Sequence, residues 1–470
     1  MSEQLDQNGS QTAQLVVIGA GPGGYAAAFT AADLGMEVTL IDPAVKPGGV
    51  CLYRGCIPSK SLLHVAKLVT EAAEADAIGV AFAQPQLDLD RIRAWKDEVI
   101  DKLTDGLAMT VQQKKITYLQ GTAKLTDPHT LAVTSVDGTD LTLTFEQAIL
   151  ATGSRPITLP GAPKNDPRVV DSTGALALPD VPRRLLVVGG GYIGLELGSV
   201  YAALGSEVSV VEMMPGLLPG VDRDLVSVLK RRLDGKFAAI MLNTKVDAMN
   251  LKDDGVEVIF RDKKDNVSAE NFDRVLVAIG RRPNNENLGL TNTSIELDER
   301  GFVPVDGQRR TAEPHIFAIG DLAGEPQLAH KAHAEAQVAA AVAAGHTTTY
   351  EPRAIPAVVF TDPEIAWCGL TETEARAQKR KIKSGKVPWR GNGRTLTLGR
   401  EDGITKVIVD PESDRLLGIA MAGPGAGELI AEGVLALEMA SVGEDLRQTI
   451  HPHPTLSETV YEAAEMLRRS

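Results

Sequence analysis

Two segments of this chain share one hydrophobic pattern, in which a short apolar run leads through a glycine-rich turn into a helical stretch. The first comprises the apolar run 15–18, the turn GAGPGG, a helical stretch that ends near Gly35, and a second apolar run at 37–41. The second repeats this order, with apolar runs at 185–188 and 207–211 around the turn GGGYIG. Continuous apolar runs bounded by turns are typical of strands buried in a parallel sheet. The pattern predicts two βαβ units, as if one nucleotide-binding domain had been inserted into another.

The remaining pattern predicts helices near 59–75 and 90–114 and a strand-like run at 141–150. After residue 354 the pattern changes to strand-like runs followed by helices, which suits a separate α+β domain. Prolines cluster on the approach to the second βαβ unit, and Arg282-Pro283 follows that unit. We therefore expect domain boundaries near residues 155, 282 and 353.

Composition narrows the class of protein. The chain has 470 residues, of which 43% are hydrophobic and 23% charged, with a net charge of -14. This charge disfavours binding to nucleic acid, which requires a cationic face, and docking on an anionic membrane. No apolar run approaches the roughly 20 residues that cross a bilayer. The polar, acidic segment MSEQLDQNGSQTAQ resembles neither a secretory signal nor a transit peptide, so we expect a cytoplasmic protein.

Both glycine-rich turns fit the dinucleotide fingerprint G-x-G-x-x-G. Its three glycines allow a tight turn, a close approach of the backbone to a pyrophosphate, and close packing of helix on sheet. The fingerprint glycines are Gly19, Gly21 and Gly24 in the first unit and Gly189, Gly191 and Gly194 in the second. A single fingerprint is a weak signal, because a glycine-rich turn can lack a ligand. Two in the correct context predict two dinucleotide sites.

A carboxylate follows each fingerprint at the same spacing. Asp42 and Glu212 each lie 18 residues after the last glycine, where a carboxylate can accept hydrogen bonds from a ribose 2′-hydroxyl. At the second site a 2′-phosphate would meet Glu212, and the following Met213 and Met214 offer no cation. The second site is therefore predicted to take NAD rather than NADP.

Cys51 and Cys56 lie in the segment GGVCLYRGCIPSK, directly after the first βαβ unit. This cysteine pair has three possible interpretations: two buried thiols, half of a metal site, or a redox pair. A metal site needs further ligands, and no Cys or His nearby has zinc spacing, so no metal is predicted. The redox interpretation is favoured because the pair leads into a new helix, with Pro58 suited to its first turn and the helix dipole favouring a thiolate at Cys56. Cys368 is interpreted as a buried small residue.

GGVCLYRGCIPSK resembles the active-site signature of the pyridine nucleotide–disulfide oxidoreductases of the glutathione reductase type. The resemblance extends over nearly the whole chain, through ATG at 151–153, AIGRRPN at 278–284, FAIGDLAG at 317–324 and HPHPTLSE at 451–458. It is greatest to the members that oxidise dihydrolipoamide with NAD in 2-oxo acid dehydrogenase and glycine cleavage complexes. It implies FAD in the first site, NAD in the second, and a homodimer whose active sites combine residues of both chains.

The same resemblance assigns domains and partners. It implies an FAD-binding domain in two parts (1–155 and 283–353), an NAD-binding domain (156–282) and an interface domain (354–470). The fold class is thus α/β, with two Rossmann-like dinucleotide-binding domains, one inserted in the other, plus a C-terminal α+β dimerisation domain. The expected partners are a second copy of the chain and the lipoyl domains of an acyltransferase core or of the glycine cleavage carrier protein.

The resemblance also implies roles for single residues. Cys51 exchanges disulfides with the substrate, Cys56 lies over the flavin, and Asp321 contacts the ribityl chain. Besides the first fingerprint and Asp42, which stands where relatives commonly carry Glu, the expected FAD contacts are Gly49, Lys60, Ala123, Thr152, Gly153, Ser154, Asp321, Gln327, Leu328, Ala329 and His330. Besides the second fingerprint and Glu212, the expected NAD contacts are Glu196, Val246 and Gly280. Lys60 is expected to pair with Glu196, although two solvated charges are the simpler interpretation.

His453 is the candidate acid–base, and Glu458 would orient its ring. The residues leave an alternative, because Thr455-Leu-Ser-Glu458 is also a capping box that would open the last helix. The family pattern favours the catalytic role, and both roles can hold together. His451 is assigned a structural role only. His330 and His333 could suggest a metal site, but a pair at this spacing is more typical of a solvated helix face.

Other functions within the fold are disfavoured. Glutathione-type reductases prefer NADPH and should carry arginines near Glu212, mercuric reductases carry a further cysteine pair near the C-terminus, and soluble transhydrogenases lack the complete cysteine pair. A non-catalytic nucleotide-binding scaffold would have no need of intact cysteines together with HPHPTLSE.

Overall fold

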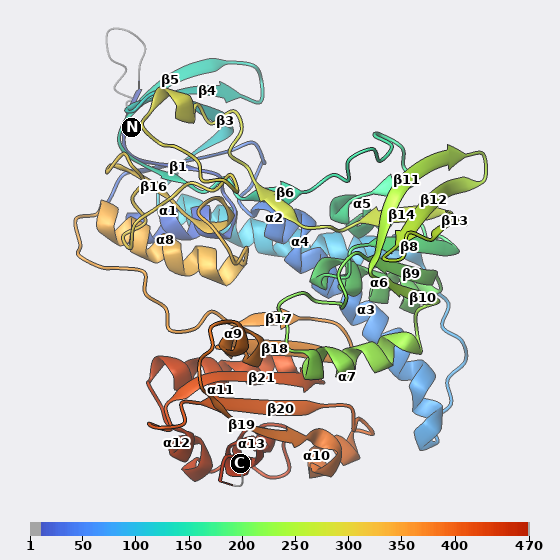
Figure 1. Ribbon diagram of the computed structural model, residues 1–470. Helices are drawn as coiled ribbons and strands as arrows, with labels where there is room; N and C mark the ends of the chain where they lie inside the picture. Colours follow the sequence, from blue (N-terminus) through green and yellow to red (C-terminus); the bar gives the residue numbers. More distant parts are fainter. Residues whose placement is uncertain (1–10, 469–470) are drawn as a thin grey trace. The chain divides into compact units, whose positions relative to one another are not determined.

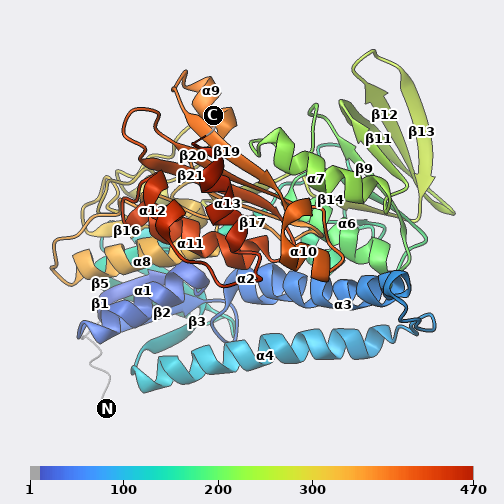
Figure 2. The same cartoon turned by 90° about the horizontal axis from the view of Figure 1, so that it is seen from below.

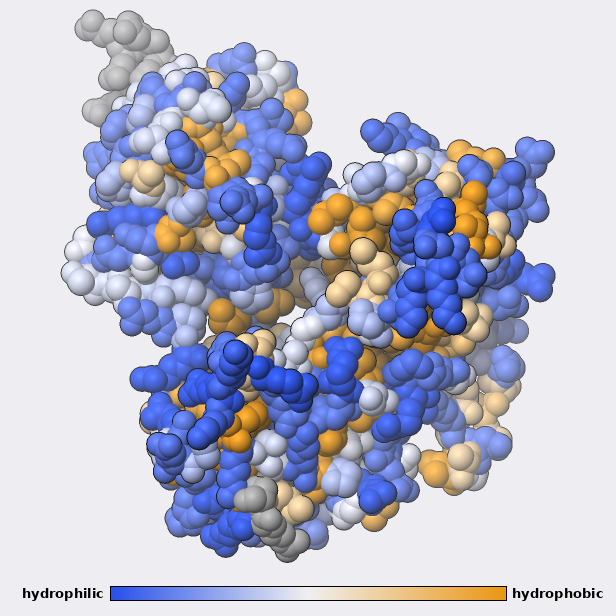
Figure 3. Space-filling view, viewed as in Figure 1, coloured by the Kyte–Doolittle hydropathy of each residue, from blue (hydrophilic) through white to orange (hydrophobic). Residues whose placement is uncertain are grey.

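The computed structural model describes residues 11–468 and divides into two compact units, each built from three segments. Unit 1 comprises residues up to Ser61, Asp90–Ile157 and Arg281–Glu351, and unit 2 comprises Leu62–Leu89, Thr158–Gly280 and Pro352 onward. Most of the N-terminal segment that we interpreted as free of targeting signals lies outside the described residues. None of the helices within 11–468 is long and apolar enough to cross a membrane. Hydrophilic residues predominate on the face shown in Figure 3.

Unit 1 is built around a parallel sheet in the order β3-β2-β1-β5-β16, with β4 antiparallel to the long ends of β3 and β5. The strands are β1 (Gln11–Ile18), β2 (Val38–Asp42), β3 (Thr117–Asp127), β4 (Thr130–Ser135), β5 (Asp140–Leu150) and β16 (Ile316–Ala318). The short strands β6 (Ser154–Pro156) and β15 (Arg281–Pro283) pair with each other where the chain leaves and re-enters the unit. The helices of unit 1 are α1 (Pro22–Asp33), α2 (Gly49–Arg54), α4 (Leu89–Gln113) and α8 (Ala329–Ala343), and α3 (Cys56–Glu74) begins in unit 1 and continues into unit 2 at Leu62.

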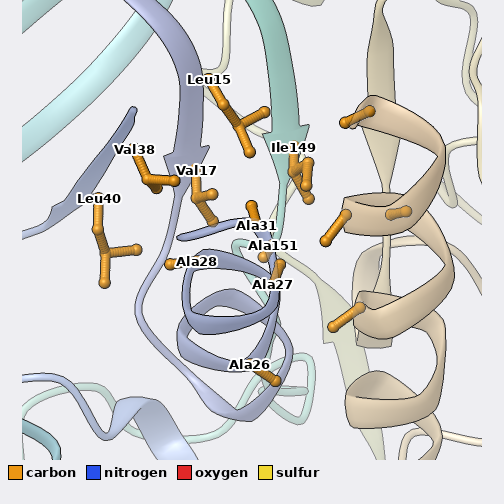
Figure 4. Close-up of a cluster of buried hydrophobic side chains, with 14 of the residues drawn as sticks. Leu15, Val17, Ala26, Ala27, Ala28, Ala31, Val38, Leu40, Ile149 and Ala151 are labelled. Atoms are coloured by element: carbon orange, nitrogen blue, oxygen red, sulfur yellow. The ribbon is translucent and has the colours of Figure 1, made fainter. Parts of the chain in front are cut away.

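The core of unit 1 explains why the second half of its central strand, β1, is apolar. Leu15, Val16, Val17 and Ile18 are all buried, because both faces of β1 are covered. Helices α1 and α8 lie side by side in both views (Figure 1; Figure 2). Alanines of α1 point into the cluster between this helix and the strands (Figure 4). Small side chains on both helices permit this close approach, which holds α8 in a fixed place beside the first fingerprint.

The first part of unit 2 repeats this architecture. Its parallel sheet has the order β10-β9-β8-β14-β7 and carries the antiparallel sheet β11-β12-β13. The elements are β7 (Val169–Val170), α5 (Ser172–Leu176), β8 (Arg184–Val188), α6 (Tyr192–Leu204), β9 (Glu207–Glu212), α7 (Arg223–Asp234), β10 (Ala239–Leu242), β11 (Thr244–Lys252), β12 (Gly255–Asp262), β13 (Val267–Phe272) and β14 (Arg274–Val277). Both predicted βαβ units are therefore present.

The last part of unit 2 is an antiparallel sheet in the order β17-β18-β21-β20-β19, with α11 packed on β18 and β21 and α13 packed on β19 and β20. Its elements are β17 (Ala357–Val359), β18 (Glu364–Gly369), α9 (Glu372–Ala377), β19 (Lys383–Pro388), α10 (Gly393–Thr397), β20 (Ile404–Val409), β21 (Leu416–Gly423), α11 (Ala426–Glu438), α12 (Gly443–Gln448) and α13 (Glu458–Met466). This is the α+β region expected after residue 354. The assignment of four domain ranges stays a prediction, although the unit boundaries after 157, 280 and 351 lie close to the expected ones.

Candidate active site

The outer glycines of the first fingerprint are required by the packing of the protein itself. Gly19 directly follows β1 with a φ of +98°, and a Cβ built there would lie 2.4 Å from the Ala151 carbonyl oxygen. A Cβ at Gly24 would lie 1.7 Å from the Gly19 carbonyl oxygen. These contacts bring the N-terminus of α1 directly over the end of the strand. The turn and the close helix packing that the fingerprint predicts are both present.

No such packing contact requires glycine at the middle position of the fingerprint. Gly21 is the N-cap of α1 with a φ of -73°, which any residue adopts, and a Cβ there would meet only the Gly49 Cα, at 3.8 Å. A side chain would instead fill the space in front of the helix N-terminus, where unpaired N–H groups favour a phosphate. Gly49, at the start of α2, approaches the same turn so closely that its own Cβ would lie 2.4 Å from the Gly21 Cα. Open space at this one position fits the pyrophosphate of a dinucleotide.

Asp42 lies beside this turn at the end of β2. Its Oδ2 accepts a hydrogen bond from the Ala20 N–H at 2.7 Å, and its Oδ1 accepts one from the Ala44 N–H at 2.9 Å. Glu212, at the end of β9, is held in the same way by the N–H groups of Gly190 and Met214, both at 2.7 Å. The two acids thus occupy equivalent places in the two nucleotide-binding units.

Asp321 is fixed by two neighbours in unit 1. Ser154 Oγ donates a hydrogen bond to Asp321 Oδ2, and Arg281 Nε donates to Ser154 Oγ at 2.8 Å. Thr152 and Gly153 are tied to Asn284: Thr152 Oγ1 donates to its carbonyl at 2.7 Å, and its N–H donates to the Gly153 carbonyl at 2.9 Å. Four of the predicted FAD contacts therefore gather around the crossover of β6 and β15.

Gln327 supplies a further sign of a ligand. Its Nε2 is buried and has no hydrogen-bond partner among the described residues. Buried amide groups are normally paired, so such a donor calls for an explanation. The sequence resemblance places Gln327 against the isoalloxazine ring, whose polar atoms would supply that partner. Leu328, the N-cap of α8, and Ala329 and His330, its first residues, complete this edge, and the donor set fits FAD.

Ala123 and Val246 lie on strands, whereas Glu196 lies in α6 and Gly280 lies between β14 and β15. Ala123 is buried on β3 in register with Val133, and Val246 lies on β11 in register with Phe260. Gly280, with a φ of +121°, ends its segment of unit 2. The buried carboxylate of Glu196 accepts a hydrogen bond from the Phe360 N–H at 3.0 Å. Its expected pairing with Lys60, a residue of unit 1, stays a prediction.

The two cysteines of the signature meet at the junction of two helices. Cys51 lies within α2, Cys56 is the first residue of α3, and only Gly55 separates the helices. The Cys51 thiol forms a hydrogen bond with Cys56, which, together with burial, raises the pKa of Cys51 well above its ordinary value. The positive charge of Lys60 acts in the opposite direction. The two thiols therefore lie close enough to interact, as a redox pair requires. No His/Cys/Asp/Glu group of metal-binding geometry found in residues 11–468 includes them.

Tyr25 is a neighbour of this pair that we did not single out in the sequence. It follows the last fingerprint glycine on α1, and burial raises its pKa to about 12, with both cysteines contributing in the same direction. Its phenol therefore remains protonated near neutral pH. Its position in the sequence, one residue after the fingerprint, was the only available signal.

His453 and Glu458 form a hydrogen-bonded pair in unit 2. His453 Nδ1 lies 2.8 Å from Glu458 Oε1, and the other carboxylate oxygen accepts a hydrogen bond from the Thr455 N–H at 2.8 Å. That N–H bond first, and the histidine second, lower the pKa of Glu458. The side chain of His453 is 77% exposed, so Nε2 is available to a reacting group. This is the geometry of a base held by an orienting carboxylate.

The capping box expected at Thr455 is only half formed. Glu458 reaches back to the Thr455 N–H, but the Thr455 hydroxyl donates to the Pro452 carbonyl at 2.7 Å instead of accepting from the helix. Helix α13 consequently begins at Glu458, two residues later than a box with Thr455 as N-cap requires. The expectation that Thr455 caps the helix was wrong, and Glu458 combines one capping contact with the histidine contact.

His451 is held at both ring nitrogens. Nε2 lies 2.7 Å from Glu432 Oε1 on α11, and Nδ1 lies 3.0 Å from the Thr449 carbonyl oxygen. These contacts fix the start of the HPHPTLSE segment two residues before His453. They agree with the structural role assigned to His451.

Residues 13–336 match the family model "Pyridine nucleotide-disulphide oxidoreductase", and residues 355–464 match its dimerisation domain. Proteins named dihydrolipoyl dehydrogenase from Haemophilus influenzae and Vibrio cholerae are each 48% identical to the chain, and each match covers 97% of this chain and 95% of the relative.

Solved structures are similar over the same length. LpdA from Mycobacterium tuberculosis matches with a TM-score of 0.89 and 27% identity, over 97% of this chain and 99% of that one. The HOCl-induced flavoprotein disulfide reductase RclA from Escherichia coli matches with a TM-score of 0.85 and 28% identity, over 96% of this chain and 99% of that one. The fold class predicted from the sequence is confirmed.

Proposed function

The chain belongs to the pyridine nucleotide-disulphide oxidoreductases, and from this premise we propose that it oxidises protein-bound dihydrolipoamide to lipoamide and reduces NAD to NADH. The observation that carries the proposal is the hydrogen-bonded contact between Cys51 and Cys56 at the edge of the first fingerprint unit. FAD and NAD are its cofactors, and FAD when bound supplies a two-electron acceptor between the dithiol and NAD.

The thiol chemistry belongs to residues of this chain. One substrate thiolate attacks the sulfur of Cys51 in the oxidised pair, forming a mixed disulfide and releasing Cys56 as a thiolate. The second substrate thiol then displaces Cys51, which leaves oxidised lipoamide and a reduced cysteine pair. Two electrons and two protons have left the substrate. Because its pKa is raised, Cys51 departs as a thiol once a neighbouring acid supplies a proton.

His453 is the group that moves these protons. Its Nε2 accepts the proton of a substrate thiol and returns one to Cys51, while Glu458 keeps Nδ1 protonated and the ring aligned. His453 belongs to the matched dimerisation domain. A homodimer brings this domain of one chain to the cysteine pair of its partner, so that each active site draws on both chains.

The lipoyl domains of an acyltransferase core, or of the glycine cleavage carrier protein, are the proposed macromolecular substrates. A lipoyl arm suits this cysteine pair, because the substrate sulfurs are the only part of the carrier protein that must reach Cys51. A cytoplasmic location is part of the same proposal.

The test is an anaerobic titration of the purified flavoprotein with dihydrolipoamide. We expect the visible flavin spectrum to change as two electrons enter, with a long-wavelength thiolate–flavin band, and NADH to form when NAD is added. The Cys56→Ser variant should show neither change. Reduction of the wild-type flavin by NADPH but not by dihydrolipoamide would contradict the proposal.

A further inference from the structure

A buried ion cluster in unit 1 lies beside the segment that carries Asp321. Glu335 of α8 is fully buried, and its carboxylate lies 2.9 Å from Arg309 Nη1 and 3.0 Å from Lys331 Nζ. Lys331 is itself 5% exposed. Charged groups buried to this extent are costly unless paired, so a specific arrangement is being maintained here.

The cluster holds the backbone of the Asp321 segment at three points. Glu335 Oε2 accepts a hydrogen bond from the Gly320 N–H at 2.7 Å. Lys331 Nζ donates to the Gly320 carbonyl at 3.3 Å and to the Gly324 carbonyl at 3.2 Å. Residues at both ends of the segment 320–324 are therefore bound to side chains of one helix.

The backbone at this place cannot easily adopt another position. Gly320 has a φ of +69°, and a Cβ there would lie 3.1 Å from the Ala332 Cβ. Arg309 also has a positive φ, +67°, which is uncommon for a residue with a side chain and persists only where surrounding contacts maintain it. Its contact with Glu335 and the stacking of its guanidinium on Tyr350, at 4.9 Å, are such contacts.

Helix α8 begins two residues after Gln327, whose buried Nε2 has no hydrogen-bond partner among the described residues. One rigid helix therefore determines the places of both the ribityl aspartate and the isoalloxazine edge. We propose that Glu335 and Lys331 are positioning residues for FAD: they fix the Gly320–Gly324 segment against α8 so that Asp321 and Gln327 reach the flavin together. This inference rests on the proposed function only in that FAD is the cofactor of unit 1.

The experiment compares FAD binding in the variants Glu335→Gln and Lys331→Met, prepared as full-length holoenzyme. Both are close in shape to the native side chain. We expect the Kd for FAD, from flavin fluorescence after removal and re-addition of FAD, to rise at least tenfold. We also expect a shifted flavin midpoint potential, while far-UV circular dichroism and the dimer remain unchanged.

Lys406 offers a matched control. It is a fully buried lysine of unit 2, and its Nζ lies 2.8 Å from Asp222, 2.8 Å from Asp224 and 3.1 Å from Glu372. Lys406→Met removes a buried ion cluster of the same kind, so it should lower the Tm as much as Lys331→Met while leaving the Kd for FAD within twofold of wild type.

The double variant Lys331→Met/Glu335→Gln separates positioning from stability. It removes the Lys331 charge that Glu335→Gln alone leaves without its carboxylate, so part of the Tm lost in Glu335→Gln should return. The Gly324 contact remains absent, so FAD affinity should stay low. FAD affinity that recovers together with Tm, or that falls equally in Lys406→Met, would overturn the inference. Neither substrate nor NAD enters this assay, so its outcome is independent of the dihydrolipoamide titration.

Discussion

Gly191 and Gly194 lie three residues apart in the second fingerprint, but the space beside Gly191 is open and the space beside Gly194 is filled by backbone. A Cβ at Gly191 would meet no atom within 4 Å, whereas a Cβ at Gly194 would lie 2.3 Å from the Gly189 carbonyl oxygen. Gly191 is the N-cap of α6 with a φ of -79°, so alanine fits its backbone without strain. Folding alone explains Gly194, whereas no contact within the protein requires glycine at position 191, which we predict to face the dinucleotide.

The variant Gly191→Ala should therefore affect NAD and not stability. We expect the KM for NAD to rise about tenfold, which corresponds to about 1.4 kcal/mol of lost binding. The Tm should be unchanged or slightly higher, because alanine restricts the unfolded chain. Steady-state kinetics and thermal unfolding of the same preparation measure both. A variant with normal KM for NAD would contradict the assignment of this site.

Gly194→Ala is the companion variant with the opposite expectation. Its new methyl group would meet backbone at 2.3 Å and Val187 Cγ1 at 3.0 Å, neither of which can move freely. Overpacking of this kind costs about 1–3 kcal/mol. We expect a lower Tm, measured by calorimetry, and a stability equal to wild type would show that α6 can shift away from β8.

Local motifs were the features that the sequence predicted well. Gly19, Asp42 and the cysteine pair belong to short patterns whose geometry follows from chain connectivity, and the structure places each where the pattern requires. Glu335 was not predicted, because Lys331 and Glu335 at i and i+4 have the spacing of an ordinary surface pair. The packing of α8 within unit 1, against α1 and the turn Gly320–Leu322, buries them, and Arg309 contacts Glu335 there.

At Thr455 the converse happened, because the sequence predicted a contact that the structure does not form. Thr-x-x-Glu is the correct sequence for a capping box, but the Thr455 hydroxyl is already engaged by the Pro452 carbonyl. A competing acceptor three residues earlier in the chain is not visible in the capping pattern. The roles of His453 and Glu458 at a site shared between two chains stay predictions, because they depend on a partner chain.

Glu458→Gln should impair the thiol half-reaction selectively. The amide can still accept a hydrogen bond from the Thr455 N–H, but its NH₂ group would face His453 Nδ1 and favour the wrong tautomer. We expect kcat with dihydrolipoamide to fall about 10²-fold or more. Oxidation of NADH by an artificial electron acceptor, which bypasses the cysteines, is the control and should be nearly unchanged. An equal loss in both assays would argue for a purely structural role of Glu458.

The exposed apolar side chains of α11 predict the dimer interface. Leu435 is 63% and Met439 70% exposed, and their spacing of four residues places them on one face of the helix. Large exposed apolar residues within a matched dimerisation domain are the natural centre of an interface. We expect Leu435→Asp to shift the protein toward monomers in sedimentation analysis and to abolish activity with dihydrolipoamide.

Leu251 provides the control for that substitution. It is 43% exposed on β11, in the nucleotide-binding part of unit 2 and outside the dimerisation domain. Leu251→Asp should remain dimeric and active. Dissociation of Leu251→Asp but not of Leu435→Asp would place the interface elsewhere.

The raised pKa of Cys51 predicts an unusual pH dependence of its alkylation. A raised pKa lowers the thiolate fraction at any given pH, so the reduced enzyme should react slowly with iodoacetamide at Cys51 near neutrality. An ordinary thiol with the reference pKa of 9.0 approaches its maximal rate above that pH, whereas the rate at Cys51 should continue to rise about tenfold per pH unit.

Because the hydrogen bond with Cys56 is the largest cause of the shift, Cys56→Ala should move this profile to lower pH and increase alkylation at neutral pH. Peptide mass analysis of the alkylated protein measures the rate at Cys51 alone. A slower reaction in Cys56→Ala, or a profile that levels off near pH 9, would mean that Cys56 does not hold the proton on Cys51.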